Sequence, residues 1–457
     1  MTVKKPANQY LRALLAEAAW TGQQFARAVN SVAAENGVQA RYDRTSVAHW
    51  LRGVVPRPRV RVLAAEALGR RLGRLVTPVD LGWAAESPDV SSAEQQDWPP
   101  DAVTRLTHLC RADTDPLQGP RLHWSVYQAI AAAPQRHVPV PYTYERDVPS
   151  TQYPVDTGAL VLGTAIPFFS MALEIGGTHA RMALAAYLGS DVPTGLRKAI
   201  PRPQSRSLVT DAARLLYLLA RMHSDDAHDG LAQRYFRVAF ELAGTVNDST
   251  TQATVLRAMS NQAGALRHIG ASLALAEHAC ELLPSSAPPG VHAFVTSQQA
   301  VALALAGQKP AARTALHRAE AWQQQRESAT PTSPCGSTPA DFSTYTPAAW
   351  CFQRGRTLVA LGERTAAAAA FRTSLAHRSP HAHRARALTQ AALTRLLLQT
   401  GHVDEACASY HELLDIAPYP QSARVRQALL DLKRMLRPFG KSPAVRRLLE
   451  HAEHVSR

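Results

Sequence analysis

The segments GQKPAA at residues 307–312, GERTAA at 362–367 and GHVDEA at 401–406 carry one pattern, a glycine five residues before an alanine. Nine residues after each glycine stands a large apolar residue: Leu316, Phe371 or Tyr410. A glycine lets the chain turn sharply between two helices, a small alanine lets those helices touch, and a bulky side chain fills the space beside them. The pattern therefore predicts repeated pairs of antiparallel helices.

Further copies of this unit are expected on both sides. Degenerate copies are predicted at Gly270 with Ala279 and Pro284, and at Ala232 with Phe236 and Ala239. The glycines at 270, 307, 362 and 401 are then 37, 55 and 39 residues apart, and the longest interval holds a Ser-, Thr- and Pro-rich flexible insertion at 323–345. The pattern resembles the tetratricopeptide repeat, whose unit is about 34 residues. Outer helical pairs are expected at 158–172 with 179–188 and at 421–436 with 442–454.

A different pattern, several short helices, occupies residues 8–82. Thr21 and Asp43 are each placed to begin a helix, since their side-chain oxygens can accept a backbone N–H that has no partner in the first turn. Gly53 is placed to end the helix that Asp43 begins. An amphipathic helix is expected to follow at 59–72.

The predicted helix at 44–52 has two unlike faces. Val47, Trp50 and Leu51 recur at three- and four-residue spacing and should face a core. The remaining faces carry short polar and cationic side chains: Arg44, Thr45, Ser46, His49 and Arg52. Side chains of this kind on an exposed helix are suited to read base edges in a DNA major groove.

The segment TSVAHWLRG at 45–53, followed by Pro56, resembles the recognition helix and following turn of the XRE, or lambda-repressor-like, helix-turn-helix regulators. Residues 23–26 resemble the start of the helix that precedes it. The chain departs from that family at Leu51, where Glu is common, and in a longer connection from Asn30 to Asp43. The candidate DNA-binding residues are Gln23, Gln24, Arg41, Arg44, Thr45, Ser46, His49, Arg52, Arg57 and Arg59.

These candidates are expected to play two roles. Thr45, Ser46 and His49 are placed to touch bases, whereas Arg41, Arg57 and Arg59 are placed to contact phosphates, which gives affinity without sequence information. The charge distribution favours this interpretation. Residues 1–77 hold 13 Lys or Arg and 4 Asp or Glu, a net of +9, and the rest of the chain holds 37 and 32, a net of +5. An Arg-rich codon bias would spread the excess evenly, whereas a DNA-binding domain concentrates it.

The sequence thus predicts an all-α protein in three parts: a helix-turn-helix domain at 1–83, a linker and irregular helical segment at 84–155, and a tetratricopeptide-like α-solenoid at 156–457. The cysteines are odd in number and widely spread, which is typical of reduced thiols in a cytoplasmic protein: Cys110, Cys280, Cys335, Cys351 and Cys407. No signal-peptide pattern and no membrane-length apolar run is present, so a cytoplasmic, nucleoid-associated protein without a membrane partner is expected.

No motif of an enzyme is evident, because the sequence has no P-loop, no H-E-x-x-H and no Rossmann glycine pattern after a strand. Two groups of polar residues could hold a metal ion, but we expect both to lie in exposed interhelical turns: His377, His381 and His383 near Pro380, and His223, Asp225, Asp226 and His228. No catalytic residue, metal or cofactor is therefore expected.

The pairing of the two domains resembles the XRE–tetratricopeptide regulators of actinobacteria and the peptide-pheromone receptors of other Gram-positive bacteria. The resemblance implies a transcription regulator that binds double-stranded DNA, forms a homodimer through its repeats and binds a regulatory peptide, small molecule or protein. It leaves open the operator, the effector and whether the protein is a repressor or an activator. The alternative is a protein-interaction scaffold built on the repeats, without specific DNA binding.

Overall fold

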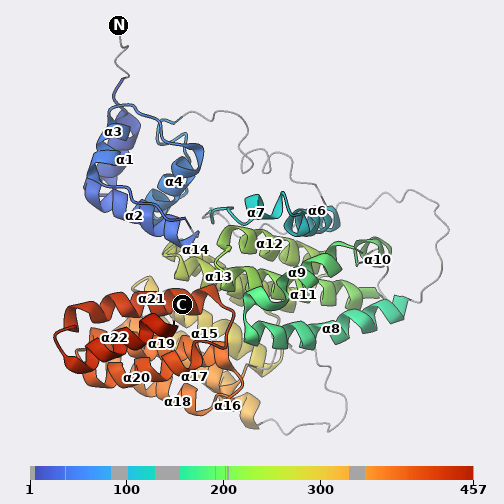
Figure 1. The fold of residues 1–457 in the computed structure, drawn as a ribbon. Helices are drawn as coiled ribbons and strands as arrows, with labels where there is room; N and C mark the ends of the chain where they lie inside the picture. Colours follow the sequence, from blue (N-terminus) through green and yellow to red (C-terminus); the bar gives the residue numbers. More distant parts are fainter. Residues whose placement is uncertain are drawn as a thin grey trace.

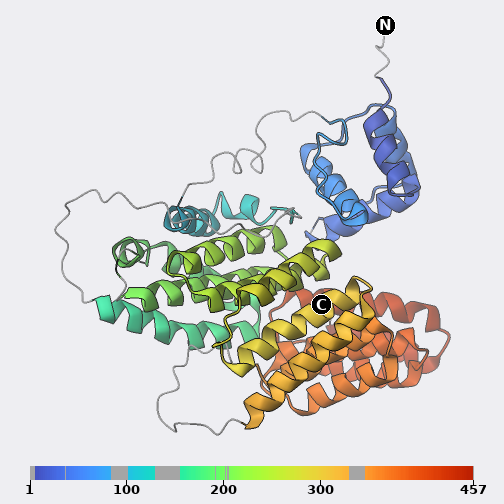
Figure 2. The same cartoon turned by 180° about the vertical axis from the view of Figure 1, so that it is seen from behind.

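The computed structural model describes residues 6–36, 38–83, 101–128, 155–190, 192–200, 202, 205–328 and 345–455. Within these ranges every regular element is a helix and none is a β-strand, which confirms the all-α prediction. Figures 1 and 2 show a small N-terminal group of helices beside a long array in which neighbouring helices pack in pairs.

The N-terminal group has a core of its own. Its helices are α1 (Gln9–Glu17), α2 (Gly22–Glu35), α3 (Arg44–Leu51) and α4 (Pro58–Leu72). Phe25, Trp50 and Trp83 meet in this core, where the Phe25–Trp50 and Trp50–Trp83 ring centroids are 6.1 and 6.0 Å apart in edge-to-face contacts. The Asn8 side chain donates to the Leu81 carbonyl at 2.7 Å and so ties the end of this group to its beginning.

The array is a succession of antiparallel helical pairs with the short helix α10 (Val192–Ala199) after the first of them. The pairs are α8 (Val155–Ile175) with α9 (Gly177–Gly189), α11 (Arg206–Asp225) with α12 (Asp229–Thr245), α13 (Ser249–Ala265) with α14 (Ile269–Leu282), α15 (Pro289–Leu305) with α16 (Lys309–Ser328), α17 (Pro347–Leu361) with α18 (Arg364–Ala376), α19 (His383–Gln399) with α20 (Val403–Ile416), and α21 (Ala423–Leu436) with α22 (Pro443–Val455).

The turns inside the five pairs from α11 to α20 share one backbone conformation. Their central residues all have positive φ: Ala227 (63°), Arg267 (70°), Gly307 (78°), Gly362 (89°) and Gly401 (81°). The N–H after each of them donates to the carbonyl five positions earlier at 2.9–3.0 Å, which is the hydrogen bond of a Schellman helix end. The predicted glycine turns at 307, 362 and 401 are therefore present.

The turn of the degenerate copy predicted at Gly270 was placed wrongly along the chain. Gly270 lies inside α14, and the turn residue is Arg267, three positions earlier. The spacing from 267 to 307 is thus 40 residues, not 37, and equals the spacing from 227 to 267. Glycine marks only three of these five turns, because Ala227 and Arg267 adopt the same left-handed conformation.

Five residues after each turn residue stands a small side chain with no exposed surface. These residues are Ala232, Ser272, Ala312, Ala367 and Ala406, each 0% exposed. At this point the two helices of a pair are in contact, as at Gly264, where an added Cβ would lie 2.9 Å from the Ser272 hydroxyl. The expected large residues Leu316, Phe371 and Tyr410 are also buried.

Several helices begin or end at other residues than the sequence predicted. The helix α16 continues to Ser328, so the predicted insertion cannot begin at residue 323, and its remainder at 329–344 lies outside the described residues. The helix α2 continues to Glu35, which shortens the connection expected to start at Asn30. The expected linker holds α6 (Ala102–Thr114) and α7 (Gly119–Leu122), and the apolar face of α6 belongs to the core of the array. Its flanks at 84–100 and 129–154 lie outside the described residues.

The other sequence-level expectations concern membranes and cysteines. Among the helices that the structure describes, none combines the length and apolar character needed to cross a bilayer. Cys110, Cys280, Cys351 and Cys407 form no disulfide, and Cys335 lies outside the described residues.

The corrected position of this turn can be tested by replacing two glycines. Replacing Gly307 by alanine should lower the free energy of unfolding by about 1 kcal/mol, because a Cβ disfavours the left-handed turn. The matched change Gly270→Ala should leave stability unchanged or raise it slightly, since Gly270 is helical and a Cβ there meets nothing within 4 Å. Denaturant unfolding measures the stability of both variants. An equal loss of stability in Gly270→Ala and Gly307→Ala would show that Gly270 is a turn residue after all.

Candidate functional site

The helix α3 begins and ends as its sequence predicts. Asp43 caps it by accepting from the Ser46 backbone N–H at 2.8 Å, and the Ser46 hydroxyl completes a reciprocal capping box. These hydrogen bonds lower the pKa of Asp43 below its usual value and keep the cap ionised. Gly53, with φ of 93°, follows the helix end.

The apolar residues of α3 fix which of its faces is outward. Val47 and Trp50 are buried, with Trp50 packed against Phe25 and Trp83, and Leu51 is half-buried. Gly22 in α2 lies so close that a Cβ there would contact Val47 at 3.4 Å. The opposite face of α3 therefore points away from the core.

Eight of the ten candidate DNA-binding residues are exposed. The exposed ones are Gln24, Arg41, Arg44, Thr45, His49, Arg52, Arg57 and Arg59, whereas Gln23 and Ser46 are half-buried. Two of the ten serve a helix cap as well. The Ser46 hydroxyl bonds Asp43, and the Gln24 side-chain oxygen accepts from the Thr21 N–H at 2.8 Å. Arg59 lies with its guanidinium 4.7 Å from the centre of the Trp124 ring.

The carboxylates of this group lie away from α3, apart from its cap. Glu35 and Glu66 both bind Arg70, at 2.6 and 2.7 Å, and Glu17 binds Arg74 at 2.8 Å. The first two ion pairs involve the second half of α4, and the third involves Arg74, which follows the end of that helix. Four exposed arginines in α3 or within six residues of its ends have no carboxylate within ion-pair distance among the described residues: Arg41, Arg44, Arg52 and Arg57.

The connection between α2 and α3 is held at its centre. Asn30 donates through its side-chain nitrogen to the Tyr42 carbonyl at 2.8 Å and accepts from the Tyr42 N–H at 2.9 Å. The Tyr42 ring also lies 5.3 Å from the Trp50 ring. This paired hydrogen bond sets the position at which α3 begins, although the connection is longer than a tight turn.

Residues 123–128, called the strap here, join this N-terminal group to the array. Trp124 stacks on Arg59, and Val126 packs against the N-terminal core. On the array side, Gln128 exchanges two backbone hydrogen bonds with the Gln233 side chain, at 3.1 and 2.7 Å. An added Cβ on Gly230 would lie 2.0 Å from the Ser125 carbonyl oxygen, so only glycine fits beneath the strap.

A buried hydrogen bond adds a direct contact between the two parts. The His268 Nε2 atom donates to the Glu66 carboxylate at 2.7 Å, and both side chains are nearly inaccessible to solvent. The Tyr127 ring covers His268 with ring centroids 5.1 Å apart. Figures 1 and 2 place α3 on the side of its group that faces away from the array, so this contact leaves α3 uncovered.

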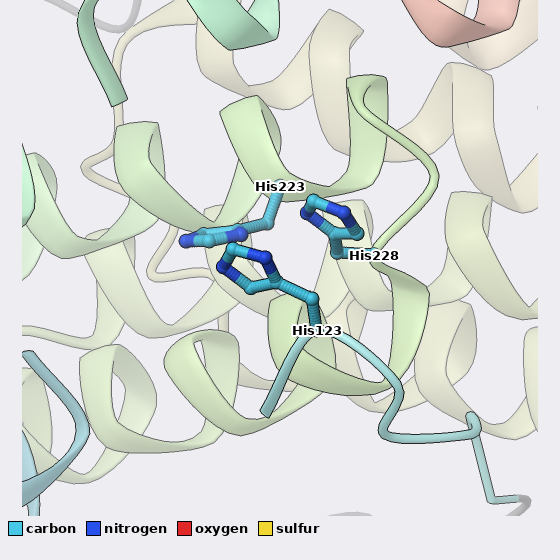
Figure 3. A group of neighbouring side chains, drawn as sticks. All are labelled: His123, His223 and His228. Carbon is cyan, nitrogen blue, oxygen red and sulfur yellow. The ribbon is translucent and has the colours of Figure 1, made fainter. Parts of the chain in front are cut away.

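The other end of the strap begins in a cluster of three histidines, His123, His223 and His228 (Figure 3). Asp113 binds two of them, His123 and His223, each at 2.8 Å, and also accepts from the Tyr235 hydroxyl at 3.1 Å. The prediction of an exposed turn was therefore wrong for this region, since His223 and Asp225 are 0% exposed.

The surroundings of the cluster shift the pKa values of its members. Burial, followed by the charges of its neighbours, lowers the pKa of His228 to about 2, so its ring is neutral. Burial alone would raise the pKa of Asp113, but the hydrogen bonds from His123 and His223 outweigh it and hold that pKa well below its usual value.

Two geometric features oppose a cation at the histidine cluster. The His123 and His228 rings are stacked, with centroids 4.2 Å apart and planes 13° from parallel, so their in-plane nitrogens cannot both point at one ion about 2 Å away. In addition, the Arg181 guanidinium lies 3.0 and 3.3 Å from nitrogens of these two rings. The histidines near Pro380 are more accessible than this cluster. His377 and His381 are exposed, and the His383 ring stacks on the Tyr419 ring with centroids 4.6 Å apart.

Comparison with protein families gives one match. Residues 11–84 match the model of the SP15 N-terminal domain. This match spans α1 to α4 and the turn that ends at Trp83, but it covers a small part of the chain. A search of curated proteins found no match.

Sequence reasoning missed the contacts between the two parts. Glu66 gave a weak signal, because an acidic residue there interrupts the buried face of the helix at 59–72. Nothing local marked His123, Trp124, Tyr127 or His268, whose partners are distant in the chain.

The direct contact can be tested by removing His268. His268→Ala should speed amide hydrogen exchange in the strap and in α4, because Glu66 loses a buried partner and the Tyr127 ring loses its support. His317→Ala, at a side chain that is 78% exposed on α16, is the matched control and should change nothing. Unchanged protection in both regions of the His268 variant would show that the two parts are held together by other contacts.

Proposed function

We propose that the protein is a transcription regulator that binds double-stranded DNA through the outward face of α3, forms a homodimer through the array and responds to an effector bound there. One observation carries the DNA-binding part of this proposal. Arg41, Arg44, Arg52 and Arg57 surround an exposed helix face, while the acidic residues Glu17, Glu35 and Glu66 pair elsewhere. A concentrated and uncompensated positive charge is the electrostatic basis of DNA affinity.

The exposed side chains of α3 and of the segment after it suit two different kinds of contact. Thr45 and His49 are exposed and carry hydrogen-bonding atoms that can reach base edges when the helix enters a major groove. Arg57, just before α4, is placed to contact a phosphate and to fix the helix in the groove. Arg59 is the weakest of the candidates, because Trp124 already stacks on its guanidinium.

An apolar stripe on α8 supports the homodimer. Val161, Phe168, Met171 and Ile175 are 49, 62, 68 and 42% exposed, and their spacing of seven, three and four residues puts them on one face of the helix. The helix α8 lies along an edge of the array in both views (Figures 1 and 2). Two copies meeting through the same stripe would bury it by two-fold symmetry and present two DNA-binding domains to adjacent half-sites.

DNA recognition is tested by two substitutions with different expected outcomes. His49→Ala should change the sequence preference, costing about 1–3 kcal/mol at one base position, because a base contact is lost. Arg57→Ala should weaken binding to all duplexes alike and reduce the salt slope by about 1, because a phosphate contact is lost. Arg313→Ala on α16 is the control. Selection from a random duplex library and mobility shifts at several salt concentrations measure these effects.

The rival function predicts a different result in the same experiment. If the repeats form a protein-interaction scaffold and the small domain binds a protein, no duplex will shift even at low salt. That result would end the DNA-binding proposal, and an unchanged sequence preference in His49→Ala would show that another face of α3 reads the bases.

The dimer is tested on the α8 stripe. Phe168→Glu should convert the dimer to a monomer, because two buried charges would meet across the two-fold axis. It should also weaken binding to a duplex with two half-sites. Leu117→Glu, at a side chain that is 82% exposed elsewhere on the surface, should leave both properties unchanged. Sedimentation measures the mass, and a wild-type monomer over the range of concentrations that binds DNA would contradict the dimer.

A further inference from the structure

A cavity of about 260 Å³ opens on the inner side of the array. Its wall is built mainly from the first helix of each of the five central pairs, α11, α13, α15, α17 and α19, with contributions from α8, α12 and α21. Because these helices come from widely separated parts of the chain, the cavity exists only when the whole array is folded.

The charges in this wall are strongly unbalanced. It holds six arginines and one carboxylate, Glu174: the arginines are Arg221, Arg257, Arg356, Arg378, Arg384 and Arg424. Arg384 is neutralised by Asp225, whose carboxylate lies 2.7 Å from its Nε. No described carboxylate lies within ion-pair distance of the other five, and Glu174 keeps one buried oxygen without a hydrogen bond.

Neutral groups hold the central arginines in place. Arg356 donates to the side-chain oxygens of Asn261 and Gln353 at 2.6 and 2.8 Å. Arg257 lies over the Phe294 ring, with its guanidinium carbon 3.9 Å from the ring centre. Such contacts fix the guanidinium groups but do not cancel their charge, so the donors that remain are held in position for a ligand.

Burying several arginines side by side lowers their pKa values, because their charged forms are destabilised. Burial, followed by the charges of Arg257 and Arg424, lowers the pKa of Arg356 from 12.5 to about 10. Burial also lowers the pKa of Arg257 and of Arg378. Cations that are removed from water and placed beside one another destabilise the folded chain unless an anion joins them.

We propose that this cavity binds a compact oxyanion with two or more negative charges, of the phosphate or polycarboxylate kind. Arginine binds both groups through two parallel hydrogen bonds, and four arginines beyond the one that can offset Glu174 require a ligand with more than one charge. The binding site stands on the described residues alone, and its role as the effector site rests on the proposed function.

A chain of contacts runs from this cavity toward the strap. Arg384 binds Asp225, whose other carboxylate oxygen accepts from the Gly177 N–H at 2.9 Å. The next residue, Asp226, lies 3.4 Å from Arg181, which in turn reaches His123 at the start of the strap. A ligand that moves Arg384 therefore acts on groups that also hold the N-terminal domain.

Binding is measured by calorimetry on the full chain without DNA, using pyrophosphate and citrate as probes at constant ionic strength. We expect at least one of them to bind with a dissociation constant below about 1 mM. Arg356→Gln should weaken that binding at least tenfold, and Arg313→Gln, at an exposed position on α16, should not change it. The choice between pyrophosphate and citrate distinguishes a phosphate from a carboxylate ligand.

A second readout separates a lost binding site from a misfolded variant. Without ligand, Arg356→Gln should unfold at the same temperature as the wild type or at a higher one, because it removes an uncompensated charge from the cavity. Glu174→Gln should tighten the binding of the probe, since it removes the one carboxylate that repels an anion.

Three results would overturn the proposal: neither probe binds at millimolar concentration, Arg313→Gln weakens binding as much as Arg356→Gln does, or the cavity accepts only an acidic peptide. These outcomes are independent of the DNA experiments. A protein that binds an oxyanion but no duplex would support the cavity proposal and end the regulator proposal. A protein that binds a duplex but no oxyanion would support DNA binding and end the cavity proposal.

Discussion

The close contact between paired helices at one small, buried residue is the constraint on which the array depends. Ala232, Ser272, Ala312, Ala367 and Ala406 all lie at this contact without exposed surface. A larger side chain there would push the two helices of a pair apart and would displace every pair stacked beyond it. The repeated contact also aligns the first helices of successive pairs, and these helices form the wall of the arginine-lined cavity.

Turns and helix caps could be predicted from the sequence because they depend on residues close together in the chain. The turns at Gly307, Gly362 and Gly401 were predicted because glycine favours a left-handed backbone. The same conformation at Ala227 and Arg267 escaped notice, because tertiary packing holds ordinary residues there and Gly270 offered a false match nearby. In the N-terminal group, the caps at Thr21 and Asp43 were predicted for the same local reason.

Long-range partners could not be found in this way. The contact of Glu66 with His268, and that of His123 with His223 and His228, join residues from distant parts of the chain. The cavity is a stronger case, since each of its arginines is ordinary in an Arg-rich chain. Only the folded array shows that Arg356 and Arg257 line one cavity in which a single carboxylate, Glu174, faces six arginines. The positions of the acidic residues thus decide where positive charge is left over, both around α3 and inside the array.

The contact between Glu66 and His268 joins positions 202 residues apart, which has a consequence for biosynthesis. At about 5–20 residues per second, a ribosome adds His268 about 10–40 seconds after Glu66. The N-terminal helices have ample time to fold before their docking partner exists. Arg70 binds Glu66 from within the same helix and can keep that carboxylate paired throughout the interval. Docking can therefore follow the folding of the N-terminal helices.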